Sequence, residues 1–175
     1  MYDIILCRPD ETVLDEIVAY RNAMLAAGSS MDGTSALNRY DNPVEWLAHV
    51  RKLENEETCP AHLVTATLYV AMRQNDRHIV GMIDLRHYLN DFLAEYGGHI
   101  GYSVRPDERR KGYASQMLAL VLQEARMRGL SRVMVTCDEA NEASRRTILK
   151  NGGVFHSNIW LEDEKTTVSR YWIKL

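Results

Sequence analysis

The sequence lacks a long hydrophobic run. No window of its 175 residues approaches 18 consecutive apolar residues, which argues against a membrane-spanning helix. The first eight residues have neither the cationic start nor the apolar stretch of a signal peptide, so we expect a cytoplasmic protein. Cysteine is also scarce. Cys7, Cys59 and Cys137 are odd in number, far apart and without metal-ligand spacing, which indicates reduced thiols and no metal site.

An excess of basic residues is absent as well. Lys and Arg number 21 and Asp and Glu number 24, so the formal charge of −3 argues against a general nucleic-acid binder. No internal repeat or low-complexity linker divides the chain. At 175 residues, with 46% hydrophobic residues, the chain can bury a substantial core. We therefore expect a single domain over residues 1–175.

The most informative segment joins an extended apolar run at 100–104 to a helical run that begins near Ala114. It carries four cationic side chains and one glycine, namely Arg105, Arg109, Arg110, Lys111 and Gly112. A helix start leaves four N–H groups without intrahelical partners at the positive end of the helix dipole. A glycine there lets a ligand approach the main chain closely. The segment therefore predicts a pyrophosphate site, with an ordinary basic turn as the alternative.

The surrounding pattern is typical of a strand–loop–helix–strand unit. Apolar residues recur at helical spacing from Ala114 to Ala125, and Gly129 is a plausible end of that helix. The short run at 133–135 is apolar and β-branched, as in a buried strand. The segment is not a Walker loop, because no Gly-Lys-Ser/Thr follows four spacer residues. It also lacks the further glycines of a dinucleotide fingerprint.

With the remaining elements, the order along the chain is strand, two helices, three strands, helix, strand, helix and two strands. Strands are predicted at 4–6, 63–72, 79–85, 154–161 and 168–173. One helix follows Asp10 and ends at Gly28, and its inward residues should be Leu14, Ile17, Val18, Met24 and Leu25. A second helix follows Asn42, and its inward residues should be Trp46, Leu47, Val50 and Leu53. This order alone indicates an α/β domain with a mixed sheet.

Two motifs carry a resemblance to a known family. Residues 109–114, Arg-Arg-Lys-Gly-Tyr-Ala, match the Arg/Gln-x-x-Gly-x-Gly/Ala signature of the GNAT superfamily of acyl-CoA-dependent N-acetyltransferases. Residues 141–144 and 151–155 resemble its second signature, an Asn that opens a helix ending in glycine before a strand. The resemblance covers most of the chain. It implies an α/β (mixed α+β) fold with a central sheet of about seven strands and about four flanking helices. The parallel strands at 100–104 and 133–137 would splay to admit the pantetheine arm.

The resemblance also implies acetyl-CoA as co-substrate and no metal. The expected coenzyme-binding residues are Val104, Arg105, Arg109, Arg110, Lys111, Gly112, Tyr113, Ala114, Ser115, Asn141 and Ser144. Main-chain amides of residues 109–114 should hold the pyrophosphate, and Arg105 or Arg110 could reach the adenosine 3′-phosphate. Asn141 could instead serve as a helix cap, and Ser144 as a helix-surface residue.

Acetyl transfer to an amine requires a base and a donor to the developing oxyanion. By resemblance, the backbone N–H of Val104 is the oxyanion donor. His99 is the candidate general base, since an imidazole has a reference pKa of about 6.5. The alternatives are Asp84, His87 and Glu95, and a structural role is an open alternative for all four residues.

The general acid departs from the family pattern. Many relatives carry a tyrosine seven residues after the helix-opening Asn, but that position here is Ile148. Tyr113 and Tyr171 are conceivable substitutes, and the role stays unassigned. Cys137 suggests a nucleophile, but direct transfer in the family favours a buried structural thiol.

The resemblance therefore implies direct transfer of an acetyl group, in a ternary complex, to a primary amine of a small molecule or peptide. An acyl-CoA-sensing module without catalysis and a binder of a phosphate-rich partner such as RNA are the alternatives. Loops 29–40 and 90–98 and the last hairpin should shape the acceptor pocket, and a homodimer stays open. Acidic residues there would suit a cationic amine: Asp32, Asp91, Glu95, Glu162, Asp163 and Glu164.

Overall fold

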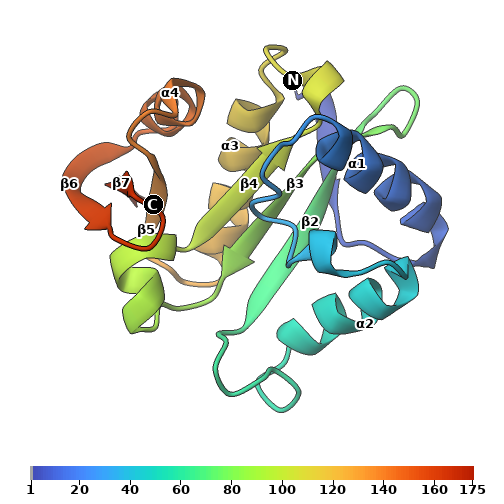
Figure 1. The fold of residues 1–175 in the computed structure, drawn as a ribbon, viewed down its shortest axis with the longest axis horizontal. Coiled ribbons are helices and arrows are strands. Elements are labelled where there is room, and N and C mark those ends of the chain that lie inside the picture. Colours follow the sequence, from blue (N-terminus) through green and yellow to red (C-terminus); the bar gives the residue numbers. More distant parts are fainter. Residues whose placement is uncertain (1) are drawn as a thin grey trace.

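The computed structural model describes residues 2–175, which form one seven-stranded sheet in the order β1-β2-β3-β4-β5-β7-β6 (Figure 1). The strands are β1 (Ile4–Cys7), β2 (Ala66–Arg73), β3 (Ile79–Arg86), β4 (Ile100–Val104), β5 (Arg132–Asp138), β6 (Val154–Leu161) and β7 (Thr166–Lys174). The α-helices are α1 (Leu14–Ala26), α2 (Pro43–Leu53), α3 (Tyr113–Met127) and α4 (Glu142–Lys150). The predicted mixed α/β fold is confirmed. No helix within the described range combines the length and the apolar character needed to cross a membrane.

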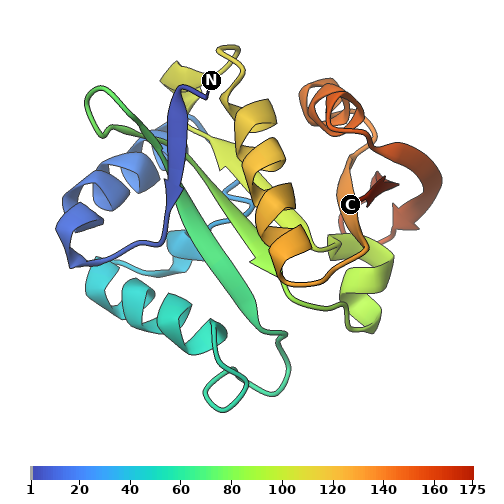
Figure 2. The same ribbon diagram turned by 180° about the vertical axis from the view of Figure 1, so that it is seen from behind.

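Each face of the sheet carries its own core. Helices α1 and α2 cover one face, and α3 lies across the opposite face (Figure 2). The four inward residues predicted for α2 are all buried, as expected. In α1 the prediction for Leu25 is wrong, because this side chain is 54% exposed. The fully buried Tyr20 lies between Ile17 and Met24 on the inward stripe instead, at spacings of three and four residues.

Local side-chain bonds start the helices. Asn42 Oδ1 accepts the N–H of Val44 at 2.9 Å, which confirms the predicted cap of α2. Asp10 caps a short 3-10 turn instead, and α1 begins after that turn. The predicted turn at 74–77 joins β2 to β3, with Arg77 at φ 61°.

Strands β4 and β5 are the parallel pair, and they meet at a single Cα pair, Ile100 with Val135. By contrast, β4 pairs with β3 from Ile100 to Val104. Past Ile100, the edge of β4 that faces β5 therefore does not pair with β5. In Figure 1 the two strands diverge toward the edge of the sheet where α3 and α4 begin. The predicted splay is present between these strands.

Candidate active site

The loop between β4 and α3 alternates between backbone conformations of opposite hand. A 3-10 turn at Pro106–Glu108 leads to an extended Arg109. Arg110 then has φ 61° and Gly112 has φ 84°, both in the left-handed region. Such alternation can turn successive N–H groups toward one side, which makes a concave anion receptor.

The N–H groups of this loop are available to a ligand. Among residues 2–175, no N–H from Arg109 to Ser115 donates to another protein group. The first bond of α3 runs from Gln116 N–H to Gly112 O at 3.2 Å. A Cβ built on Gly112 would meet nothing within 4 Å, so the main chain is open there. This is the geometry that a pyrophosphate needs at a helix N-terminus.

The basic side chains of the loop mostly contact the protein itself. Arg109 donates from Nε to Val104 O at 3.1 Å and from a terminal nitrogen to Ser29 Oγ at 2.8 Å. Arg105 pairs with Asp107 at 3.0 Å and Lys111 with Glu108 at 2.8 Å. Arg110 is exposed and has no ion-pair partner in the described part of the chain. Arg105 and Arg110 are the two candidates for binding the adenosine 3′-phosphate. Of these, Arg110 has the guanidinium that no ion pair within residues 2–175 already holds.

The backbone of Val104 faces the opening between the strands. Arg105 N–H donates to Val80 O of β3 at 2.9 Å. Since successive residues of a strand direct their N–H groups to opposite edges, the N–H of Val104 points away from β3 toward β5. Because β5 pairs with β4 only at Ile100, this N–H lies on the unpaired edge, as a donor to a ligand must.

A pair of hydroxyl groups connects β4 to α4 beside this edge. Tyr102 Oη lies 2.7 Å from Ser144 Oγ. The N–H of Ser144 donates to Asn141 Oδ1 at 3.1 Å, so Asn141 is the cap of α4. A cap was one of the two roles predicted for this residue. Burial raises the pKa of Tyr102 well above its usual range, so the phenol stays protonated at neutral pH. Tyr102 was not predicted as a site residue. It lies two residues before Val104 and therefore on the same face of β4.

The residue at the missing-tyrosine position and its two substitutes lie in the core, and the Cys137 thiol has a raised pKa. Ile148 is fully buried, and a Cβ on Gly153 would overlap it. Tyr113 and Tyr171, the substitutes for the missing tyrosine, lie in the same core. Burial raises the pKa of the Cys137 thiol, and a hydrogen bond with Ser144 only partly opposes this shift. A neutral thiol is a poor nucleophile, which agrees with a structural Cys137.

The loop at 29–40 crosses β4 on the other face of the sheet. Ser103 Oγ donates to the main-chain oxygen of Asp32 at 2.7 Å and lies 2.8 Å from Tyr20 Oη. Burial raises the pKa of Tyr20 to about 12, and the nearby Asp32 carboxylate adds to the rise. Gly33, at φ 71°, packs directly on the backbone of Gly101. The main chain of Asp32 is thus fixed next to β4 opposite the Tyr102 side, and its side chain is exposed there.

The hydrogen bonds of His99 do not support its predicted role as general base. Its Nδ1 accepts the N–H of Met134 at 2.9 Å, so the lone pair that a base needs is already used. Burial, Arg86 and Arg132 lower the pKa of His99 to about 4. The residue is 6% exposed and precedes Ile100, at the closed end of the splay.

The three alternative bases are not brought together. Asp84 is buried and accepts the N–H of Gly101 at 2.9 Å. His87 Nε2 lies 2.9 Å from Thr67 Oγ1, and burial lowers its pKa to about 4. Glu95 is exposed on the short helical turn Leu93–Gly97, within the segment 90–98.

A structural His99 has a testable consequence for stability. Its folded pKa lies below the unfolded value of 6.5, so the unfolded chain binds more protons between these values. The stabilisation is fully present above pH 6.5 and should be lost as the pH falls toward 4. We expect His99→Asn, which keeps an acceptor for Met134, to remove on the order of 2 kcal/mol of that pH dependence. Urea titrations across this pH range measure it.

The exposed His62 provides the control. His62→Gln shows how much of the change comes from the loss of any histidine, since this residue lies at the surface. The pH profile of acetyl transfer should be the same in wild type and His99→Asn. A shifted profile would restore His99 as the base.

Parallel strands that open past Ile100 and an anion cradle formed by the N–H groups from Arg109 to Ser115 are the features expected of an acyltransferase that binds a coenzyme A thioester. The profile of the acetyltransferase (GNAT) domain family matches residues 15–154, and the chain belongs to this family. It is accordingly an acetyltransferase of the family that the two motifs predicted. No curated protein sequence matches the chain.

Solved structures share the whole fold. The ribosomal-protein alpha-N-acetyltransferase RimL in complex with coenzyme A is 18% identical, with a TM-score of 0.69 over 100% of this chain and 96% of that chain. The microcin self-immunity acetyltransferase MccE, in complex with acetyl-CoA and AMP, is 16% identical, with a TM-score of 0.71 over 100% and 94% of the two chains. A spermidine N-acetyltransferase SpeG chimera from Vibrio cholerae and hSSAT is 13% identical, with a TM-score of 0.68 over 99% and 96%.

Proposed function

We propose that the chain transfers the acetyl group of acetyl-CoA directly to a primary amine of a small molecule or peptide within a ternary complex. The observation that carries this proposal is the row of unpaired N–H groups from Arg109 to Ser115, next to the unpaired edge of β4. Those amides would hold the pyrophosphate, and Arg110 would approach the 3′-phosphate. We also propose that residues 1–175 act as one cytoplasmic domain.

The reaction would take place at the unpaired edge. The amine nitrogen attacks the thioester carbon, and the carbonyl oxygen becomes an oxyanion that the N–H of Val104 stabilises. The C–S bond then breaks, and coenzyme A leaves as a thiolate. Tyr102 and Ser144, 2.7 Å apart, offer hydroxyl donors to that sulfur in place of the missing tyrosine. A thiol pKa near 8.5 means that such donors need only stabilise the thiolate.

The acceptor would enter from the side of the loop at 29–40. The exposed carboxylate of Asp32, fixed to Ser103 through its main chain, favours an amine that arrives as a cation. The cationic amine would lose one proton to water near this carboxylate before it attacks. The nitrogen of the adduct would then lose a second proton to water as the amide forms. RimL acts on a ribosomal protein and SpeG on spermidine, so protein and polyamine acceptors are both represented among similar folds.

A turnover assay tests the proposal. Purified protein with acetyl-CoA should release free thiol only when a suitable amine from a panel of polyamines, amino acids and peptides is present. The buried Ile148 favours a second candidate, the acyl-CoA-sensing module. Tight coenzyme binding without amine-dependent thiol release from any acceptor would support that alternative.

The hydroxyl pair gives a separate prediction. Tyr102→Phe keeps the ring but removes the donor, so kcat should fall about tenfold while coenzyme affinity stays within about twofold of wild type. Ser144→Ala should behave similarly. Single-turnover rates and calorimetry measure the two quantities. An unchanged kcat in both variants would remove these hydroxyls from the mechanism.

A further inference from the structure

The coenzyme loop contains a buried carboxylate that the mechanism above does not use. Glu108 is 6% exposed and immediately precedes the row of N–H groups assigned to the pyrophosphate. An uncompensated negative charge at this position would repel an anionic ligand. The charge of a carboxylate here must therefore be neutralised locally, and two neighbouring cations do this.

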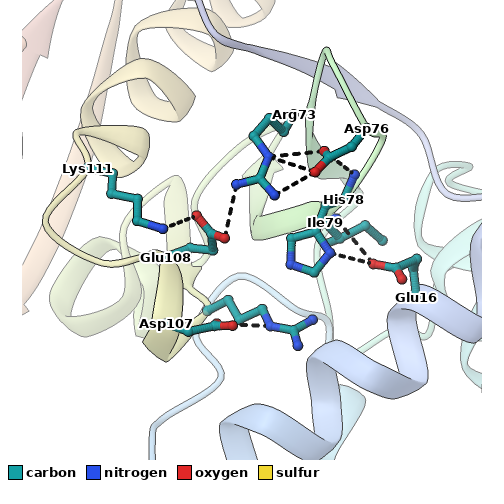
Figure 3. Close-up of polar contacts among 9 residues, drawn as sticks. Glu16, Arg73, Asp76, His78, Ile79, Asp107, Glu108 and Lys111 are labelled. Atoms are coloured by element: carbon teal, nitrogen blue, oxygen red, sulfur yellow. Dashed lines mark hydrogen bonds and ion pairs between the residues drawn. The ribbon is translucent and has the colours of Figure 1, made fainter.

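Two cations bind Glu108 from opposite sides (Figure 3). Arg73, at the end of β2, pairs with Oε1 at 3.1 Å, and Lys111, within the loop, pairs with Oε2 at 2.8 Å. Burial by itself would raise the pKa of Glu108. Lys111 and Arg73 outweigh burial and hold the pKa below its usual value, so the carboxylate is ionised at neutral pH.

Arg73 is itself held in place. It pairs with Asp76 of the β2–β3 turn at 2.7 Å, so Glu108 ties the loop to a neighbouring part of the sheet. His78, Asp107 and Glu108 bring potential metal-ligand atoms within 4.8 Å of one another. Each is already paired: His78 with Glu16 at 3.1 Å, Asp107 with Arg105 and Glu108 with its two cations. These contacts already use the ligand atoms of the cluster, so it is explained without a metal ion.

The Lys111–Glu108 pair spans the strained part of the loop. Between its two ends lie Arg109 and Arg110, and the left-handed φ of Arg110 is unfavourable by about 1 kcal/mol or more for a non-glycine residue. An ion pair that joins both ends of this segment, one of them anchored through Arg73, holds it in the shape that exposes its N–H groups. The ammonium of Lys111 is thus committed to Glu108, although the lysine side chain is 49% exposed.

We infer that Glu108 is a positioning residue, which fixes Lys111 and Arg73 so that the amide cradle is formed before the coenzyme arrives. The inference rests on the proposed coenzyme site. It assigns Lys111 an indirect role, through Glu108, in place of the direct phosphate contact that its charge suggests. Removal of either partner should then have the same effect, and removal of both should add little.

A double-mutant cycle tests this. Glu108→Gln and Lys111→Gln should each weaken coenzyme A binding about tenfold by calorimetry, and the double variant should be no weaker than the worse single variant. Asp107→Asn is the matched control, because Asp107 lies in the same turn with its own ion pair but is exposed. Its affinity should stay within about twofold of wild type. Equal or tighter binding by Glu108→Gln, or multiplicative losses in the double variant, would overturn the inference.

A shorter donor separates positioning from loss of fold. S-acetylpantetheine lacks the diphosphate, so its kcat/KM should be unchanged in Glu108→Gln, whereas the KM for acetyl-CoA should rise about tenfold with kcat preserved. Loss of activity with both donors would indicate general damage and overturn the specific role. If the wild type binds no coenzyme A, the proposed function and this inference fail together. If the wild type binds and Glu108→Gln binds equally well, only this inference fails.

Discussion

Gly112→Val should weaken coenzyme A binding at least 100-fold while the protein remains folded. A Cβ at this position meets no protein atom within 4 Å, so the new side chain would project into the open space of the cradle. That is the space through which a pyrophosphate must approach the main chain, and a valine there would exclude it by contact. Calorimetry with coenzyme A measures the loss, and thermal unfolding checks the fold.

The control for this variant lies at the other end of the same helix. Gly129, just past the end of α3, has the same φ of 84° as Gly112 and also has nothing within 4 Å of a built Cβ. Gly129→Val should therefore suffer similar backbone strain, roughly 1–2 kcal/mol, without reaching the coenzyme. Equal losses of affinity in the two variants would attribute the effect to strain. Retained affinity in Gly112→Val would remove the pyrophosphate from this loop.

The sequence predicted features that depend on local chemistry. Side-chain periodicity predicted α3 correctly, because one face of a helix meets one core. Asn42 and Asn141 were recognisable caps, since each bonds an N–H two or three residues away. The sequence also predicted a coenzyme loop, because glycine and the helix start are adjacent in the chain, and this assignment stays a prediction. The prediction for Leu25 failed, since periodicity alone does not fix the centre of a buried stripe.

The features that the sequence did not reveal depend on distant partners. Tyr102 meets Ser144 across 42 positions, and Arg73 meets Glu108 across 35. No local pattern connects such residues, because their contact requires the sheet to be assembled first. His99 shows the same limit. Its residue type suits a base, but the N–H of Met134, 35 positions away, occupies its nitrogen.

Gly33→Ala should lower the stability of the fold more than any other addition of a single methyl group in the loop at 29–40. Its Cβ would overlap the carbonyl oxygen of Gly101 and lie 2.7 Å from the N–H nitrogen of Tyr102, both of which belong to the rigid backbone of β4. The φ of 71° adds strain that alanine tolerates poorly. We expect a loss on the order of 3 kcal/mol or more in the free energy of unfolding, measured by urea titration. If the chain relieves the clash by lifting the loop, the loss should appear instead as a higher KM for the amine.

Gly28→Ala isolates the contribution of the close approach. Gly28 has a similar φ of 60°, but a Cβ there meets nothing within 4 Å, so the variant bears the backbone strain alone, about 1 kcal/mol. Arg109 of the coenzyme loop donates to Ser29 Oγ in this loop, so coenzyme A affinity is measured in both variants as well. An equal loss of affinity in the two variants would be assigned to that contact and not to the approach of Gly33 to β4. A Gly33→Ala protein with wild-type stability and wild-type amine KM would show that the loop does not rest on β4. In that case Asp32 would no longer be fixed beside the reacting atoms, and the acceptor side of the proposed mechanism would have to be assigned elsewhere.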